Sequence, residues 1–118
     1  MSIDLATFNP ANVSEFTKAL TSEISDLGKD WWNKNSSIVR GYIRSLAHAA
    51  QQTGKALAAG VIDAAYAKEL LERQKDAFGT AIKFGEFMTA ALAQSVVDKA
   101  FGLIAAAIKN KTGISISL

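Results

Sequence analysis

Apolar side chains recur every three or four residues along most of the chain, which is the spacing of one face of an α-helix. Near the N-terminus, Asn9 followed by Pro10 is a typical helix start, because the Asn side chain can cap a helix and proline fits its first position. The Asn and Ser cluster at 33–37 favours a cap or a turn. A first helix is therefore predicted over residues 10–33. Its apolar stripe is Val13, Phe16, Leu20, Ile24, Leu27 and Trp31.

A second helical stripe follows this polar cluster. Ser36 or Ser37 can cap its start, and the chain reaches the stretch AAGVID at its end. Gly60 suits the left-handed position after a helix, and Asp63 suits the cap of the next one. A link this short usually joins antiparallel helices, so we predict a second helix over 37–59 and a chain reversal after it. The apolar positions of this stripe are Val39, Tyr42 or Ile43, Leu46, Ala49 or Ala50, Thr53 and Leu57.

The third stripe is the longest and contains no proline. It begins at Ala64, and its weak points are Gly79, Gly85 and Gly102, each of which costs about 1 kcal/mol relative to Ala in an exposed helix. One interpretation is a single helix over 63–109, which would be about 65 Å long. The other is a chain bent near Gly85, which gives four helices of similar length. The pattern alone allows both.

These stripes predict an all-α protein, an antiparallel hairpin or bundle of three to four helices. We expect a single domain over 1–118, with an N-terminal arm at 1–9 and a C-terminal tail at 110–118. The tail ends in apolar residues that alternate with Ser, which is strand periodicity, but so short a stretch cannot form a sheet alone. It is therefore expected either to fray or to pair with another surface, such as a second copy of the chain. The alternating residues are Ile114, Ile116 and Leu118.

The composition is that of an ordered domain, because 49% of the 118 residues are hydrophobic and 20% are charged. The absence of cysteine excludes disulfides and thiolate sites, and the single histidine, His48, excludes a site with two His ligands in one chain. We find no phosphate-binding Gly-rich loop and no Glu-x-x-His unit. The chain is therefore expected not to be an enzyme, and no cofactor, metal site or small-molecule substrate is expected.

The formal net charge of +2 is spread along the chain. Residues 35–59 carry Arg40, Arg44 and Lys55 and no acidic residue, which is a weakly basic helix without the dense basic face of nucleic-acid-binding proteins. No nucleic-acid partner is expected. The N-terminus has neither the basic nor the apolar region of a signal peptide, so a cytoplasmic location is the default expectation.

The stretch at 87–108 is apolar on nearly all sides of a helix. Asp98 and Lys99 interrupt it in the middle, so we interpret it as a deeply buried helix and not as a membrane span. Such a helix must be covered on most sides, and three helices of a small chain can cover it only in part. We therefore expect a homo-oligomer, with lipid or another apolar surface as the alternative cover. The contact residues predicted here are Phe87, Leu92, Val96, Leu103 and Ile104.

Two adjacent tryptophans stand at the end of the first stripe. Trp31 continues that stripe and is predicted to lie in the core. Trp32 points about 100° away from it on a helix, so we predict that Trp32 is an outward anchor for a partner or a bilayer. The alternative is that both rings close the end of the bundle.

These observations favour a non-catalytic, self-associating structural or adaptor protein that acts through protein–protein helix packing. The alternative is an amphipathic helical protein that binds a membrane or another hydrophobic surface, as a coat or by insertion. In composition the chain is similar to granule-coating phasins, which share Ala-rich amphipathic helices and the lack of cysteine. That resemblance carries no motif and implies no site residues.

Overall fold

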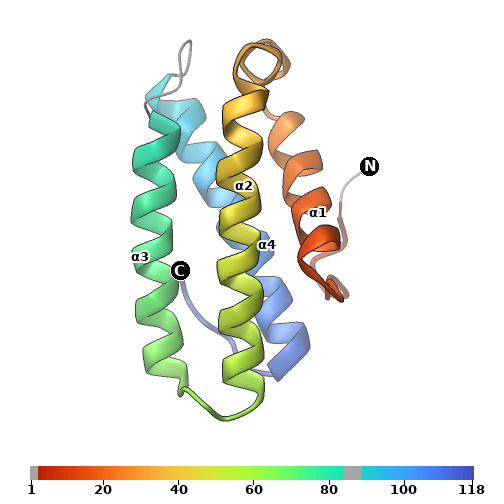
Figure 1. The fold of residues 1–118 in the computed structure, drawn as a ribbon, viewed down its shortest axis with the longest axis vertical. Coiled ribbons are helices and arrows are strands. Elements are labelled where there is room, and N and C mark those ends of the chain that lie inside the picture. The colour runs from red at the N-terminus through yellow and green to blue at the C-terminus, as the bar shows by residue number, and fades with distance from the viewer. Residues whose placement is uncertain (1–2, 84–88) are drawn as a thin grey trace.

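The computed structural model describes residues 3–83 and 89–118, and these residues form four α-helices that pack side by side (Figure 1). The helices are α1 (Val13–Ser25), α2 (Lys29–Ala58), α3 (Ala64–Lys83) and α4 (Ala90–Thr112). No strand occurs in the described part of the chain. The predicted all-α fold class is confirmed.

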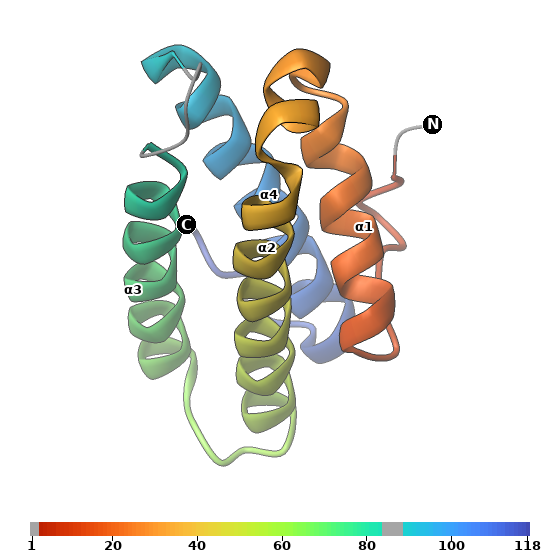
Figure 2. The same cartoon turned by 45° about the horizontal axis from the view of Figure 1, so that its top comes forward.

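The helix α2 is central to the bundle, because it packs against each of the other three helices. The helices α1 and α3 lie on either side of it, and α4 runs behind it, as two views agree (Figures 1 and 2). The links after α1 and α2 are short, so consecutive helices run antiparallel. The Cα atoms span 41 × 27 × 21 Å along the principal axes.

The first helix is capped by Asn12 and not by Asn9. Asn12 Oδ1 accepts a hydrogen bond from the Glu15 backbone N–H at 2.9 Å, and Glu15 Oε2 accepts one from the Ala11 N–H at 2.7 Å. Such a reciprocal pair is similar to the capping box. The prediction that Asn9 and Pro10 start the helix is therefore wrong, because the later Asn has a matching Glu three residues on. Pro10 precedes the helix and is buried.

The break between the first two helices lies at residues 26–28 and not in the polar cluster at 33–37. The helix α2 runs through that cluster, where Asn35 Nδ2 donates a hydrogen bond to the Trp31 carbonyl oxygen at 3.1 Å. Asn or Ser inside a helix costs only about 0.5 kcal/mol per residue relative to Ala, while burying one large apolar side chain contributes about 1.5–3 kcal/mol. The predicted end of the first helix and start of the second are therefore wrong.

The predicted reversal at AAGVID is confirmed. Gly60 adopts the left-handed conformation with φ of +74°, and the Val61 N–H donates to the Ala56 carbonyl oxygen at 2.9 Å. Asp63 Oδ1 accepts a hydrogen bond from the Tyr66 N–H at 2.8 Å. The turn therefore closes α2 and opens α3 with the two residues that the sequence indicated.

The long third segment forms two helices, α3 and α4, that lie side by side. Thr89 caps α4, and its Oγ1 accepts a hydrogen bond from the Leu92 N–H at 3.1 Å. The helix α4 ends at Gly113, which has φ of +77°, so it extends past the predicted end at residue 109. The four-helix alternative is therefore the observed one. Gly85, the predicted bend, lies outside the described residues.

The N-terminal arm folds back beside α1 (Figure 1). The Ile3 N–H donates a hydrogen bond to Glu23 Oε1 at 2.9 Å. At the other end of the arm, Asn110 Nδ2 of α4 donates to the carbonyl oxygens of Leu5 at 3.0 Å and Phe8 at 2.8 Å. The arm thus covers the groove between α1 and α4.

The C-terminal tail also packs on its own bundle. Ile116 is buried, Ile114 and Leu118 are partly buried against the core, and Leu118 lies with Lys75 and Phe101 between α3 and α4. The tail forms no strand. Of the two expected outcomes, fraying is wrong: the tail packs against a surface, which is that of its own bundle.

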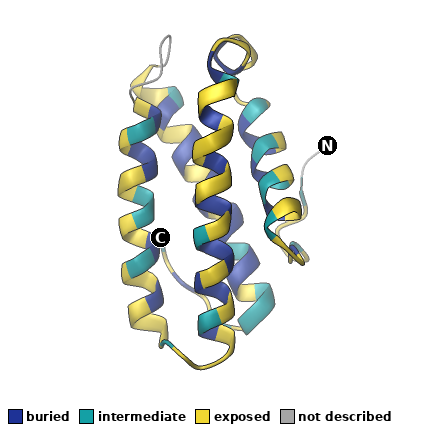
Figure 3. Cartoon of the chain, viewed as in Figure 1, coloured by how far each residue is buried: buried dark blue, intermediate teal, exposed yellow. Residues whose placement is uncertain are grey.

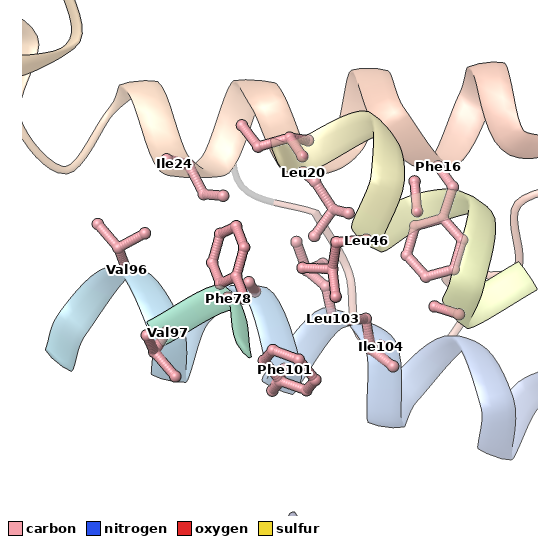
Figure 4. Packing of buried hydrophobic residues seen from close by; sticks show 14 of the residues in the cluster. Phe16, Leu20, Ile24, Leu46, Phe78, Val96, Val97, Phe101, Leu103 and Ile104 are labelled. Atoms are coloured by element: carbon pink, nitrogen blue, oxygen red, sulfur yellow. The ribbon is translucent and has the colours of Figure 1, made fainter. Parts of the chain in front are cut away.

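The hydrophobic core draws on all four helices and lies on their inward faces (Figures 3 and 4). Because α4 runs behind α2 and between α1 and α3, its apolar residues meet side chains from every other helix. Core residues labelled in Figure 4 include Phe16, Leu20, Ile24, Leu46, Phe78, Phe101, Leu103 and Ile104.

Candidate functional site

The contact residues predicted on α4 lie inside the single chain. Val96, Leu103 and Ile104 are fully buried by the chain's own helices. Leu92 is partly buried, and a Cβ placed on Gly28 would lie 3.2 Å from its Cδ2. The reason for placing these residues between two copies is thereby removed. Phe87, the fifth predicted contact on this stretch, lies outside the described residues.

The predicted contact residues are buried because the single chain covers α4 on most sides. The sequence argument counted only three helices against the apolar stretch, whereas the structure adds both ends of the chain to the three neighbouring helices. The arm closes one side of α4 and the tail closes the other. No second copy is needed to bury this helix.

Both tryptophans are buried at the start of α2. Trp31 is 2% exposed and Trp32 is 8% exposed, and their ring centroids lie 6.3 Å apart. The prediction for Trp31 is confirmed, and the prediction that Trp32 points outward is wrong. The helix α2 contacts three other helices, so its buried arc is wide enough for neighbours that point about 100° apart. The Arg40 guanidinium lies over the Trp32 ring, 5.1 Å from its centroid.

An apolar groove with a volume of about 280 Å³ lies between α2 and α3. It lies between the two helices at the front of the bundle in Figure 1. We call it the α2–α3 groove. Its lining residues are Tyr42, Ser45, Leu46, Ala49, Gln74, Ala77, Phe78 and Ala81.

Small side chains make this groove. Ala49 on α2 and Ala77 and Ala81 on α3 all line it, and their methyl groups leave space between the helices unfilled. None of the lining residues comes from the arm or the tail, whose residues line hollows of about 220 Å³ and 300 Å³ beside α4. The α2–α3 groove therefore stays open to a partner.

One end of the groove carries large exposed apolar side chains. Tyr42 is 40% exposed, and Ile38, one helical turn before it, is 61% exposed. With Ser45 and Ala49 they follow the three- and four-residue spacing of one helix face. The sequence contained a signal for this exposed face, because the second stripe could be drawn through either Tyr42 or Ile43. Ile43 faces the core, and Tyr42 faces the groove.

Gln74 is the one amide in the groove lining. Its Oε1 is buried and has no hydrogen-bond partner among the described residues. A buried acceptor without a partner is unfavourable by about 1–3 kcal/mol. A rotation of the amide would let Gln74 Oε1 accept a hydrogen bond from a bound molecule, which would remove this unfavourable energy.

The helix α2 is basic, whereas α3 carries charges of both signs, with the bases Lys68, Arg73, Lys75 and Lys83 beside its acids. The outward face of α2 carries Arg44, His48 and Lys55, and the chain has no acidic residue between Asp30 and Asp63. The acids on this side of the molecule therefore all come from α3. They are Glu69, Glu72 and Asp76.

Two of these acids have ion-pair partners on their own helix. Arg73 Nη2 lies 2.6 Å from Glu69 Oε1, and Lys68 Nζ lies 3.9 Å from Glu72 Oε1. Both pairs join residues one helical turn apart on α3. Both pairs are exposed, so each contributes at most about 1 kcal/mol.

The structure gathers no catalytic constellation in the described ranges 3–83 and 89–118. No three His, Asp or Glu side chains converge there on a point that could hold a metal ion. His48 is exposed on α2. Glu23, the buried acid among the residues that the structure describes, accepts a hydrogen bond from the arm and lies 3.4 Å from Lys99 Nζ, so it fastens the arm.

Comparison of the chain with protein-family models, with curated proteins and with solved structures gave no match. Within the described residues, α4 is long and apolar enough to cross a membrane by length and composition, and half of its most apolar window is buried in the bundle. The core helix of a soluble bundle has this same length and composition, so core helices and membrane-spanning helices share these properties.

Proposed function

We propose that the protein is a non-catalytic structural or adaptor protein that works by packing the α2–α3 groove against another helical surface, foremost a second copy of itself. The observation that carries this proposal is the groove itself, an apolar space of about 280 Å³ between two helices of the chain. Exposed apolar surface with this organisation is typical of interaction sites.

The groove suits a helix better than a small ligand. It is bounded by two antiparallel helices, and small residues on both walls allow a third helix to approach to the usual 8–10 Å between axes. Covering the exposed parts of Ile38 and Tyr42 would supply apolar burial at one end, worth up to about 1.5–3 kcal/mol for each fully buried side chain. Ridges on a partner helix would fill the space over the alanines.

The alternative function is binding to a membrane or another hydrophobic surface. It is favoured by the apolar length of α4 and by Val61, which is 75% exposed at the α2–α3 turn. Insertion of α4 would require the bundle to open, because this helix supplies much of the core. Surface binding without opening would use the exposed side chains alone.

The two functions differ in a direct measurement of mass. Light scattering of the full chain in plain buffer, with and without vesicles that contain anionic lipid, separates them. We expect an oligomer of defined mass that does not change when vesicles are added. A monomer that binds the vesicles would support the membrane-binding alternative. A protein that stays monomeric and does not bind the vesicles would refute both functions.

A further inference from the structure

We propose that residues 3–8 of the N-terminal arm form a strap that opens as one unit while the four helices stay folded, and that Asn110 of α4 is the latch that holds it closed. The strap lies over the seam between α1 and α4 (Figure 1). None of its residues lines the α2–α3 groove, so the device is independent of the proposed function.

The backbone of the strap is bound to the bundle by side chains. Within the part of the chain that the structure describes, its backbone-to-backbone hydrogen bond runs inside the strap, from the Thr7 N–H to the Asp4 carbonyl oxygen at 3.2 Å. The hydrogen bonds to the helices are that of the Ile3 N–H with Glu23 Oε1, at 2.9 Å, and the two that Asn110 donates. Opening the strap therefore breaks no backbone hydrogen bond of a helix.

Asn110 is the latch because one amide group holds two points of the strap. Its Nδ2 donates to the Leu5 carbonyl oxygen at 3.0 Å and to the Phe8 carbonyl oxygen at 2.8 Å. The turn at residues 5–7 brings these two oxygens to the same side chain. A side-chain amide carries two N–H donors, and both have acceptors here. Loss of this amide leaves both carbonyl oxygens without a donor from α4.

The space beneath the strap is incompletely filled. Ile3 and Leu5 of the strap and Leu103 of α4 are among the residues that line a hollow of about 220 Å³. Leu5 is 51% exposed. Atoms that face an empty space lack the dispersion contacts of a packed interior. The strap therefore has the low contact density of segments that open locally at low free energy.

Pro10 marks the fixed end of the arm. It is buried and lines the same small space as Phe16 of α1, Gly54 of α2 and Ile108 of α4. A residue that lies among three helices stays in place unless the core is disturbed. Asn9, which precedes it, is exposed, so we place the hinge of the strap at Asn9.

Opening uncovers apolar surface at the seam between α1 and α4. The Phe8 ring lies edge-on to the Phe16 ring, with centroids 5.7 Å apart and planes at 80°. Phe16 is 1% exposed in the closed chain. Glu23 Oε1 loses the Ile3 N–H at the same time, while Glu23 Oε2 keeps Lys99 Nζ at 3.4 Å. The strap thus controls access to an apolar face that lies beside a carboxylate.

Amide hydrogen exchange of the full chain in increasing concentrations of urea tests the strap. Local opening exposes little surface, so exchange at the Ile3 N–H should hardly change at low urea concentrations. Exchange at the buried Ile43 and Leu71 amides needs global unfolding and should rise steeply with urea. Equal slopes at the three amides would overturn the strap, because Ile3 would then be released only when the bundle unfolds.

The variants Asn110→Ala and Asn110→Asp test the latch, since both remove the two N–H donors. We expect exchange at the Ile3 amide to become about tenfold faster or more in both, from the loss of two hydrogen bonds. Asn110 binds Leu5 and Phe8 and not Ile3, so this result would show that the strap opens as one unit. Gln52→Glu, an amide-to-carboxylate change at an exposed position of α2, is the control and should leave exchange at Ile3 unchanged.

The core amides should speed up in the two Asn110 variants by no more than the Ile3 amide does, because the folded chain loses the same two hydrogen bonds. Unchanged exchange at Ile3 in both variants would overturn the latch. Faster exchange in the core with unchanged exchange at Ile3 would show that Asn110 stabilises the bundle and not the strap. If neither variant folds, the urea series on the wild type decides whether the strap opens by itself.

Discussion

The Arg40 guanidinium lies 5.1 Å from the centroid of the Trp32 ring. This contact places a cation over a ring that is 8% exposed, at the start of α2. The residue that was expected to anchor a partner is thus covered by its own helix. The tryptophan pair closes the end of the bundle, where it packs against the core.

We predict that both tryptophans are required for stability. Trp31→Ala and Trp32→Ala should each lower the free energy of unfolding by about 3–5 kcal/mol, as for other buried aromatic side chains. Urea denaturation measures both. Trp31 Nε1 has no hydrogen-bond partner among the described residues, so Trp31→Phe should cost less than Trp31→Ala. Strong acrylamide quenching of Trp32 in the Trp31→Phe variant would contradict the burial of Trp32.

Arg40 and Arg44 provide a matched comparison on one helix. Arg40→Gln should lower the free energy of unfolding by about 0.5–1 kcal/mol, because the contact with Trp32 is lost. Arg44→Gln should change it by less than about 0.5 kcal/mol, since this side chain lies on the exposed face of α2. Equal losses in the two variants would show that the ring contact contributes no stability.

The N-terminal arm should be released by loss of the Glu23 carboxylate. In Glu23→Ala the Ile3 N–H loses its acceptor and Lys99 loses its partner, so stability should fall by about 1–3 kcal/mol. Glu23→Gln keeps an acceptor oxygen and should lose less. Amide hydrogen exchange at Ile3 reports the arm directly. Protection of that amide in Glu23→Ala equal to the wild type would contradict the fastening role.

Two glycines should respond in opposite directions to the same substitution. Gly41→Ala should raise the free energy of unfolding by about 0.5–1 kcal/mol, because the residue lies inside α2 and nothing lies within 4 Å of the added methyl group. Gly60→Ala should lower it by about 1–2 kcal/mol, since Gly60 holds φ of +74°. Thermal denaturation of both variants checks the pair. Stabilisation by Gly60→Ala would contradict the left-handed turn, and destabilisation by Gly41→Ala would contradict the open space beside Gly41.

The sequence predicted the turn at AAGVID because the signals there are local. A glycine with positive φ and an acidic cap act on their own backbone, so Gly60 and Asp63 can be interpreted without knowledge of the fold. The break after α1 is different. The cluster at 33–37 has equally clear turn residues, but α2 contacts three helices and its buried face outweighs their weak preference.

The neighbours of core residues and the position of the groove also depend on the whole fold and not on local signals. Leu103 could be recognised as apolar, yet its surroundings include Ile3 and Leu5 of the N-terminal arm, which lie there only because the arm folds back. The groove could not be located, because it results from a pairing of Tyr42 with Ala77 and Ala81 across two helices. Periodicity places a residue on a helix face, and only the packing shows whether that face is covered.

We propose that the α2–α3 groove mediates association, and an arginine placed in its lining tests this claim. Ala77 is an exposed residue of the groove lining, and Ala58 is an exposed residue at the end of α2 outside that lining. An arginine at either position leaves the core untouched, and at Ala77 it blocks the groove. Sedimentation equilibrium over a wide concentration range should show a dimer for the wild type and for Ala58→Arg, and a monomer for Ala77→Arg. The same dimer mass for all three proteins would contradict the claim.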